Sequence, residues 1–185
     1  MKKKVLWITR TAVMLALLVA TQAVTASFGQ LVTGSCVNGI LAVCVLMVGL
    51  RSGLTVALIS PLVAYMLGIA PQVLVVPAIM LGNAAYVTLL FLIARNACGY
   101  KLGDIFRRIV AWLVAAAAKF AVMYTIVVWV VCNLLRDRIV ASGVKPPVLD
   151  TKLPQMFSFP QLITALIGGG VALLILPVLR KAVRK

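Results

Sequence analysis

Residues 33–71 read TGSCVNGILAVCVLMVGLRSGLTVALISPLVAYMLGIAP. They belong to two apolar runs, at 31–50 and 53–70, that are separated only by Arg51-Ser52-Gly53. A helix of about 20 largely apolar residues is long enough to cross a bilayer. Because a three-residue connection leaves no room for more than a turn, the pattern predicts a tight hairpin of two membrane-spanning helices.

Similar apolar runs occupy the rest of the chain, at about 5–27, 73–94, 107–135 and 159–179. The 185 residues are 64% hydrophobic, and the mean hydropathy is +1.16, whereas soluble domains are only about half apolar. We therefore expect an all-α integral membrane protein in which residues 1–185 form one compact bundle of six transmembrane helices.

The charged residues are unevenly distributed between the two sides of this predicted bundle. The chain has 18 Lys and Arg against 3 Asp. If the N-terminus is inside, thirteen of the basic residues flank the inner ends of the spans and four lie outside. The positive-inside rule then predicts that both termini are cytoplasmic. The basic residues flank apolar runs and do not alternate with aromatic ones, so nucleic-acid binding is not expected.

The first 26 residues can also be compared with a cleaved signal peptide, with Ala26 at its end. Its loss would leave five spans and reverse the charge argument. We expect the segment to stay as the first helix.

Side chains that usually carry catalysis are scarce. The chain has no His and no Glu, and Asp104, Asp137 and Asp150 all fall in predicted loops. The four cysteines form no C-x-x-C pair, and no Gly-rich phosphate-binding loop occurs. We expect no enzymatic activity, no cofactor and no metal site in this chain, and the lack of intramembrane acids also argues against proton-coupled transport.

Small residues are spaced for close helix contact at two places. Ala12, Ala16 and Ala20 recur every four residues and so share one face of the first helix. Gly168-Gly169-Gly170 lies within the last span. Such residues let another helix approach closely, either inside the bundle or from a partner protein.

Six spans in under 200 residues, a basic N-terminus and the A-x-x-x-A-x-x-x-A pattern resemble the substrate-binding S components of energy-coupling factor (ECF) vitamin transporters. Residues 33–71 and the segment VPAIMLGNAAYV at 76–87 add to this resemblance, which covers nearly the whole chain. It implies a subunit of a bacterial or archaeal cytoplasmic membrane that captures a small water-soluble vitamin or precursor from outside.

The resemblance also implies partners. An S component works with a transmembrane coupling subunit and two cytoplasmic ATPase subunits, which would supply the ATP hydrolysis missing here. The docking surface for the coupling subunit maps onto Ala12, Ala16 and Ala20, and the gating loop between the first two helices maps onto residues 27–38.

Four uncharged polar or aromatic residues are candidates for ligand binding. Thr33 and Asn38 fall in the expected gating loop, although they are also compatible with an ordinary outer loop. Asn83 and Tyr86 are three residues apart and so share a face of the fourth span. A buried amide in lipid needs a partner, which is either a neighbouring helix or a ligand.

Lys119 lies within WLVAAAAKFAVMY at 112–124, near the middle of the fifth span. A charge at that depth costs at least ~2.5 kcal/mol. It either snorkels inwards, caps backbone carbonyls or meets an anionic ligand, and Tyr124 on its outer side either stacks on that ligand or packs between helices. If Lys119 binds the ligand, we expect a carboxylate, phosphate or polarised acceptor and no permanent cation.

Two other functions stay open at this stage. One is a solitary facilitator or channel without ATPase partners, and the other is a structural membrane protein without cargo.

Overall fold

The computed structural model describes residues 2–69, 72–97 and 101–183. Within these ranges the regular structure is helical and includes no strand. The elements are α1 (Lys2–Thr25), η1 (Ala26–Phe28), α2 (Gln30–Met47), α3 (Leu50–Met66), η2 (Val73–Val75), α4 (Val76–Ala94), α5 (Leu102–Met123), η3 (Tyr124–Leu134), α6 (Arg136–Ala141), η4 (Val148–Lys152), α7 (Leu153–Phe157) and α8 (Phe159–Val183). The expected all-α class is confirmed.

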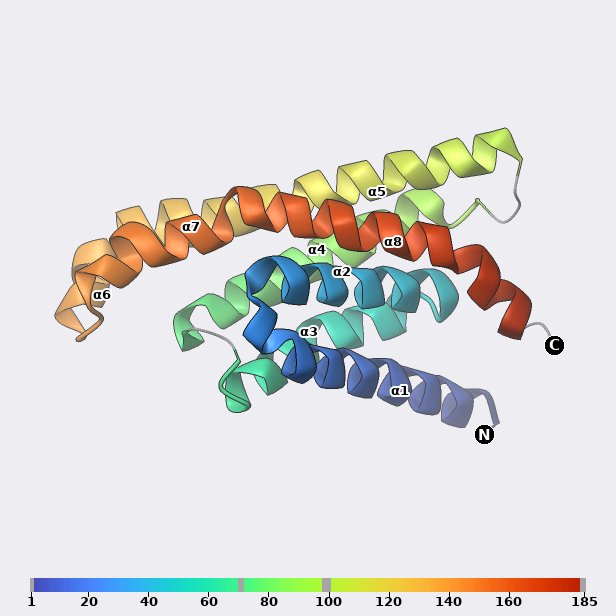
Figure 1. The fold of residues 1–185 in the computed structure, drawn as a ribbon, viewed down its shortest axis with the longest axis horizontal. Coiled ribbons are helices and arrows are strands. Elements are labelled where there is room, and N and C mark those ends of the chain that lie inside the picture. The colour runs from blue at the N-terminus through green and yellow to red at the C-terminus, as the bar shows by residue number, and fades with distance from the viewer. Residues whose placement is uncertain (1, 70–71, 98–100, 184–185) are drawn as a thin grey trace.

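The long helices run side by side along one axis, and the chain reverses direction at each end (Figure 1). The start of α1, the α2–α3 turn and the end of α8 share one end of the bundle, which we call the terminal end. The α1–α2 connection, α6 and α7 lie at the other end, which we call the distal end. Among the described residues, the predicted inner basic residues fall on segments at the terminal end, and the predicted outer ones on segments at the distal end. Arg184 and Lys185 lie outside the described residues.

Among the described residues, five helical stretches are long and apolar enough to cross a membrane. They are Lys4–Phe28, Gln30–Met47, Val73–Ala94, Leu102–Leu134 and Val148–Ala182. The predicted span at 53–70 corresponds to Leu50–Met66, an apolar helix that is shorter than 18 residues. The fold is therefore that of a multi-pass membrane protein, with α3 as a shorter apolar helix inside it.

Two predicted loops differ from the structure. Most of residues 27–38 is helical, because α2 begins at Gln30 directly after Gly29, whose φ of 86° makes the turn. Residues 136–158, which connect the predicted spans at 107–135 and 159–179, form α6, η4 and α7. These short helices bury Ile139, Leu149 and Phe157, so their stability comes from packing and not from length.

The buried apolar residues form two clusters. The larger one joins α1, α2, α3, α4, α5 and α8 around Leu18, Leu41 and Tyr86. The smaller one lies at the distal end, where α7 and η4 cover Val127 and Val131 of η3. The distal helices therefore close one end of the bundle with their own apolar core.

Glycine permits the closest helix contact, which is between α2 and α8. A Cβ added to Gly168 would overlap Ser35 O and lie 2.7 Å from Gly39 N and 2.9 Å from Asn38 Cβ. Two of these atoms belong to the backbone, which cannot rotate away. The expectation that the glycines of the last span allow close packing is confirmed.

Gly168→Ala is expected to destabilise the protein by about 1–3 kcal/mol, because the added methyl group forces α2 and α8 apart. Thermal unfolding of the detergent-solubilised protein measures this. The control is Gly103→Ala in α5, where a Cβ meets nothing within 4 Å. Equal melting temperatures for the two variants would show that the α2–α8 contact does not limit stability.

Candidate functional site

A buried lysine connects three helices. Lys119 of α5 is only 3% exposed. Its Nζ donates one hydrogen bond to Asn38 Oδ1 of α2 and one to Asn83 Oδ1 of α4, each 2.6 Å long. Asn38 Nδ2 in turn donates to Thr164 Oγ1 of α8 at 3.3 Å. One polar network therefore joins α2, α4, α5 and α8 within an apolar core.

Small residues around this network make room for it. Ala115 and Ala116 of α5 are fully buried. A Cβ on Gly82, next to Asn83, would lie 2.7 Å from Met123 Sδ and 3.7 Å from Lys119 Cγ. Because Gly82 has no side chain, α4 and α5 approach closely enough for the amide and the ammonium to meet.

Lys119 and both asparagines also line a partly open cavity of about 100 Å³. Side chains of α1, α2, α3, α4, α5, α7 and α8 contribute to its wall. The lining residues are Gln22, Gln30, Thr33, Gly34, Val37, Asn38, Pro61, Ala64, Ile69, Ile79, Asn83, Lys119, Met123, Phe157 and Gln161. Four of the six sequence-predicted ligand residues thus meet at one cavity: Thr33, Asn38, Asn83 and Lys119.

Two further glutamines at the cavity, Gln22 and Gln161, were not singled out from the sequence. Gln161 Nε2 donates to Met156 O at 3.2 Å. Gln22 is 9% exposed, and its Oε1 has no hydrogen-bond partner among the described residues. Gln22 could have been identified from the sequence, because it is an amide within the apolar run of the first helix. Like Asn83, such an amide needs a hydrogen-bond partner inside the membrane.

Two aromatic candidates do not line the cavity. Tyr86 is fully buried, and its ring centroid lies 5.8 Å from Lys119 Nζ, so it stabilises the ammonium from outside the cavity. Tyr124 is 43% exposed, and its ring packs against Phe120 with 5.7 Å between centroids. The structure brings Tyr86 to the network and leaves Tyr124 on the outer surface of the bundle.

The alanine row of α1 faces outwards. Ala12, Ala16 and Ala20 are all exposed, whereas Thr11 and Leu18 of the same helix are buried. The three alanines are therefore not used for packing inside this chain, and their face is open to another molecule or to lipid.

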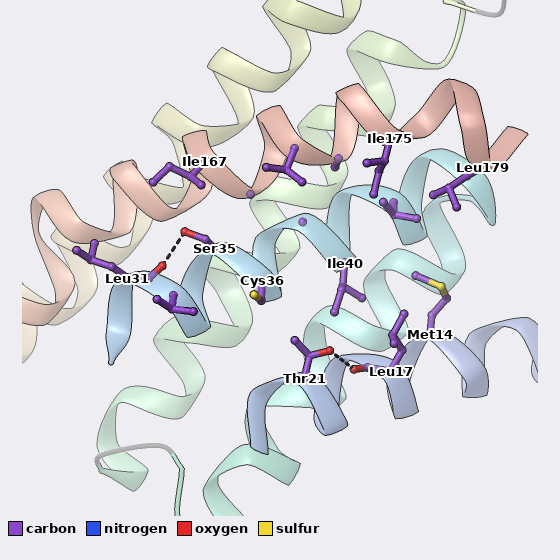
Figure 2. A pocket seen from close by; sticks show the side chains of 16 residues that line it. Met14, Leu17, Thr21, Leu31, Ser35, Cys36, Ile40, Ile167, Ile175 and Leu179 are labelled. Carbon is purple, nitrogen blue, oxygen red and sulfur yellow. Dashed lines mark hydrogen bonds between the residues drawn. The ribbon is translucent and has the colours of Figure 1, made fainter. Parts of the chain in front are cut away.

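A larger groove of about 690 Å³ lies elsewhere, between α1, α2 and α8 (Figure 2). Its wall is apolar apart from Thr21 and Ser35. The hydroxyl hydrogens of these two residues are used within their own helices, toward Leu17 O and Leu31 O at 2.7 Å each (Figure 2). Since this groove offers a water-soluble ligand only two hydroxyl oxygens as acceptors, the smaller polar cavity is the better candidate site.

Comparisons of the chain with family models, curated proteins and solved structures find no match. The candidate site therefore has to be judged from its own chemistry. Among the described residues, no group of three or more His, Cys, Asp or Glu is placed to hold a metal ion. The site offers one ammonium, several side-chain amides and one hydroxyl, which are groups able to hydrogen-bond a small polar molecule.

Lys119→Met and Asn83→Leu are expected to be energetically coupled, because each change removes one side of the same buried hydrogen bond. The double variant should differ from the sum of the single variants by about 1 kcal/mol or more in free energy of unfolding. Unfolding titrations of the four proteins in mixed micelles measure this coupling.

Ser52→Ala serves as the control partner for Lys119→Met, since the Ser52 hydroxyl bonds Thr11 Oγ1 instead. That pair should be additive within about 0.5 kcal/mol. Additivity of the Lys119 and Asn83 changes would contradict the network.

Proposed function

We propose that this chain is the membrane-embedded substrate-capture subunit of an ECF-type importer. It binds a small water-soluble vitamin or precursor from outside and delivers it together with a coupling subunit and two ATPase subunits. The observation that carries the proposal is the polar cavity beside Lys119, which lies between the helices of an otherwise apolar bundle.

A cavity of this kind is expensive to maintain in a membrane protein. Polar and charged side chains inside a bilayer are costly, and they are mostly found at functional sites. Packing alone would be served by apolar residues of similar size. A role in binding a polar solute explains why the amides and the ammonium are present despite the free-energy cost of burying them.

The position of the cavity suits capture from outside. Gln22 and Gln30 lie beside the α1–α2 connection, and Phe157 lies at the α7–α8 junction, so these lining residues belong to the distal end. The terminal end carries most of the basic residues and is cytoplasmic in our proposal, in keeping with the positive-inside rule. The cavity is then on the outer side of a bacterial or archaeal cytoplasmic membrane, with α3 as the sixth span.

Division of labour with partner subunits supports the proposal as well. The sequence contains no nucleotide-binding loop and few groups able to catalyse hydrolysis. In our proposal the exposed row of Ala12, Ala16 and Ala20 is where the coupling subunit docks, since small residues let two transmembrane helices approach closely.

The proposed function predicts that the purified protein binds a vitamin-like ligand. A water-soluble vitamin or precursor present at 100 times its dissociation constant should stabilise the purified protein by ~2.7 kcal/mol. Melting temperatures measured against a broad panel of such compounds test this. If no compound raises the melting temperature, the chain is not a capture subunit and a cargo-free role becomes the better explanation.

The second prediction separates a capture subunit from a solitary facilitator. Ala16→Leu should abolish uptake in cells that contain the partner subunits while leaving ligand binding by the purified protein unchanged, because the added bulk blocks docking only. Ala117→Leu is the matched control, since Ala117 is an exposed alanine of α5 outside the alanine row. Full uptake by the Ala16→Leu protein would favour the facilitator.

A further inference from the structure

The cavity contains an acceptor without a donor. Gln22 Oε1 is buried, lines the cavity and has no hydrogen-bond partner among the described residues. Leaving a buried acceptor unsatisfied is unfavourable. Because this oxygen has almost no accessible surface, the Gln22 side chain has to turn toward the cavity before a donor there can meet it. A bound molecule with an N–H or O–H group meets this requirement.

Three other polar groups of the cavity each donate a hydrogen bond to the protein itself. Thr33 Oγ1 donates to Thr25 O at 2.7 Å, and Gln161 Nε2 donates to Met156 O at 3.2 Å. Asn38 Nδ2 donates to Thr164 Oγ1. Each of these three groups thus has one hydrogen bound by the protein, which leaves fewer donors for a ligand and suits a ligand that brings hydrogen-bond donors of its own.

Lys119 is the exception. Its ammonium has three hydrogens, and the two asparagine oxygens accept two of them. One hydrogen is left for a further acceptor. None of the residues lining the cavity is acidic, so the positive charge is not neutralised within the site, and an anionic or strongly polarised acceptor is preferred over a cation.

The size of the cavity limits the ligand. An engineered protein cavity of about 150 Å³ binds benzene, and this one has about 100 Å³. Met123 and Phe157 add apolar wall to the amides. The free volume is smaller than that of the benzene-binding cavity, so the ligand has to be compact, and even a single-ring compound extends from it into the open side of the cavity.

Resting on the proposed function, we propose the ligand class of this site. The cavity takes a compact, single-ring-sized compound that carries an anionic or strongly polarised acceptor for Lys119 and an N–H or O–H donor for Gln22. Gln22 selects for the donor, and Lys119 selects against cations.

Four single-ring probes vary these features separately. Orotate has N–H donors and a carboxylate, uracil has N–H donors and neutral carbonyl acceptors without an anion, nicotinate has the carboxylate without an N–H donor, and 1-methylnicotinamide is a cation. Binding to the full-length protein in detergent is measured by titration calorimetry and melting temperature. Orotate should bind best, uracil and nicotinate about tenfold or more weakly because each lacks one interaction, and 1-methylnicotinamide should not bind.

Gln22→Leu tests the role of the unpartnered oxygen. It should weaken orotate and uracil about tenfold and leave nicotinate unchanged, since nicotinate has no N–H to lose. Ser60→Ala is the matched control, because Ser60 Oγ is also buried without a partner among the described residues but does not line the cavity. It should change none of the affinities.

Several outcomes would overturn the ligand class. They are binding of 1-methylnicotinamide as tight as that of orotate, or an equal loss of nicotinate and orotate affinity in Gln22→Leu. Binding of a fused-ring or cationic vitamin in preference to every single-ring anion would also overturn it, while leaving the proposed function intact. If neither these probes nor the wider vitamin panel bind, the proposed function fails as well.

Discussion

The hydrogen bonds from Lys119 to Asn38 and Asn83 are the constraint on which the rest of the bundle depends. An ammonium inside a membrane protein has to be surrounded by acceptors, and this chain has no acid in the core to serve. Two amide oxygens from different helices serve instead. Their 2.6 Å distances require α2, α4 and α5 to meet at one level, and the buried Gly82, Ala115 and Ala116 keep that level free of bulky side chains.

The same constraint explains why the polar cavity lies next to Lys119. Apolar side chains next to the network would leave the amide groups without further hydrogen-bond partners. The space beside the network is therefore lined by polar groups. Gln22, Gln30 and Gln161 continue the polar lining toward the distal end, where the wall is completed by Phe157. On the far side of the network the bundle is sealed by close packing, with Gly168 against α2 and Gly169 against Trp112 and Tyr86. The polar space is thus closed on the terminal side.

Hydropathy predicted the long helices because each contains an apolar run of about 20 residues. A run of that length is stable across a bilayer whether its side chains face lipid or other helices. It failed for residues 136–158, where α6, η4 and α7 are too short to give a periodic signal and are stabilised by contact with η3. Hydropathy predicted a span at 31–50, which agrees with α2. The gating loop at 27–38 was implied by the resemblance alone, and Gln30, Thr33 and Asn38 within it belong to α2 and line the cavity.

The amino-acid sequence by itself determined the all-α class and the excess of basic residues on one predicted side of the bundle. It also showed a lysine without an acidic partner in an apolar run, and polar residues at helical spacing. These depend on local composition and on distance along one helix. Only the tertiary structure decided which polar residues meet. Asn38 and Lys119 are 81 positions apart, and Gln22 and Gln161 come from opposite ends of the chain. It also turned Tyr124 outwards and Ala16 away from the core, because the rotation of a helix is set by how its neighbours pack against it.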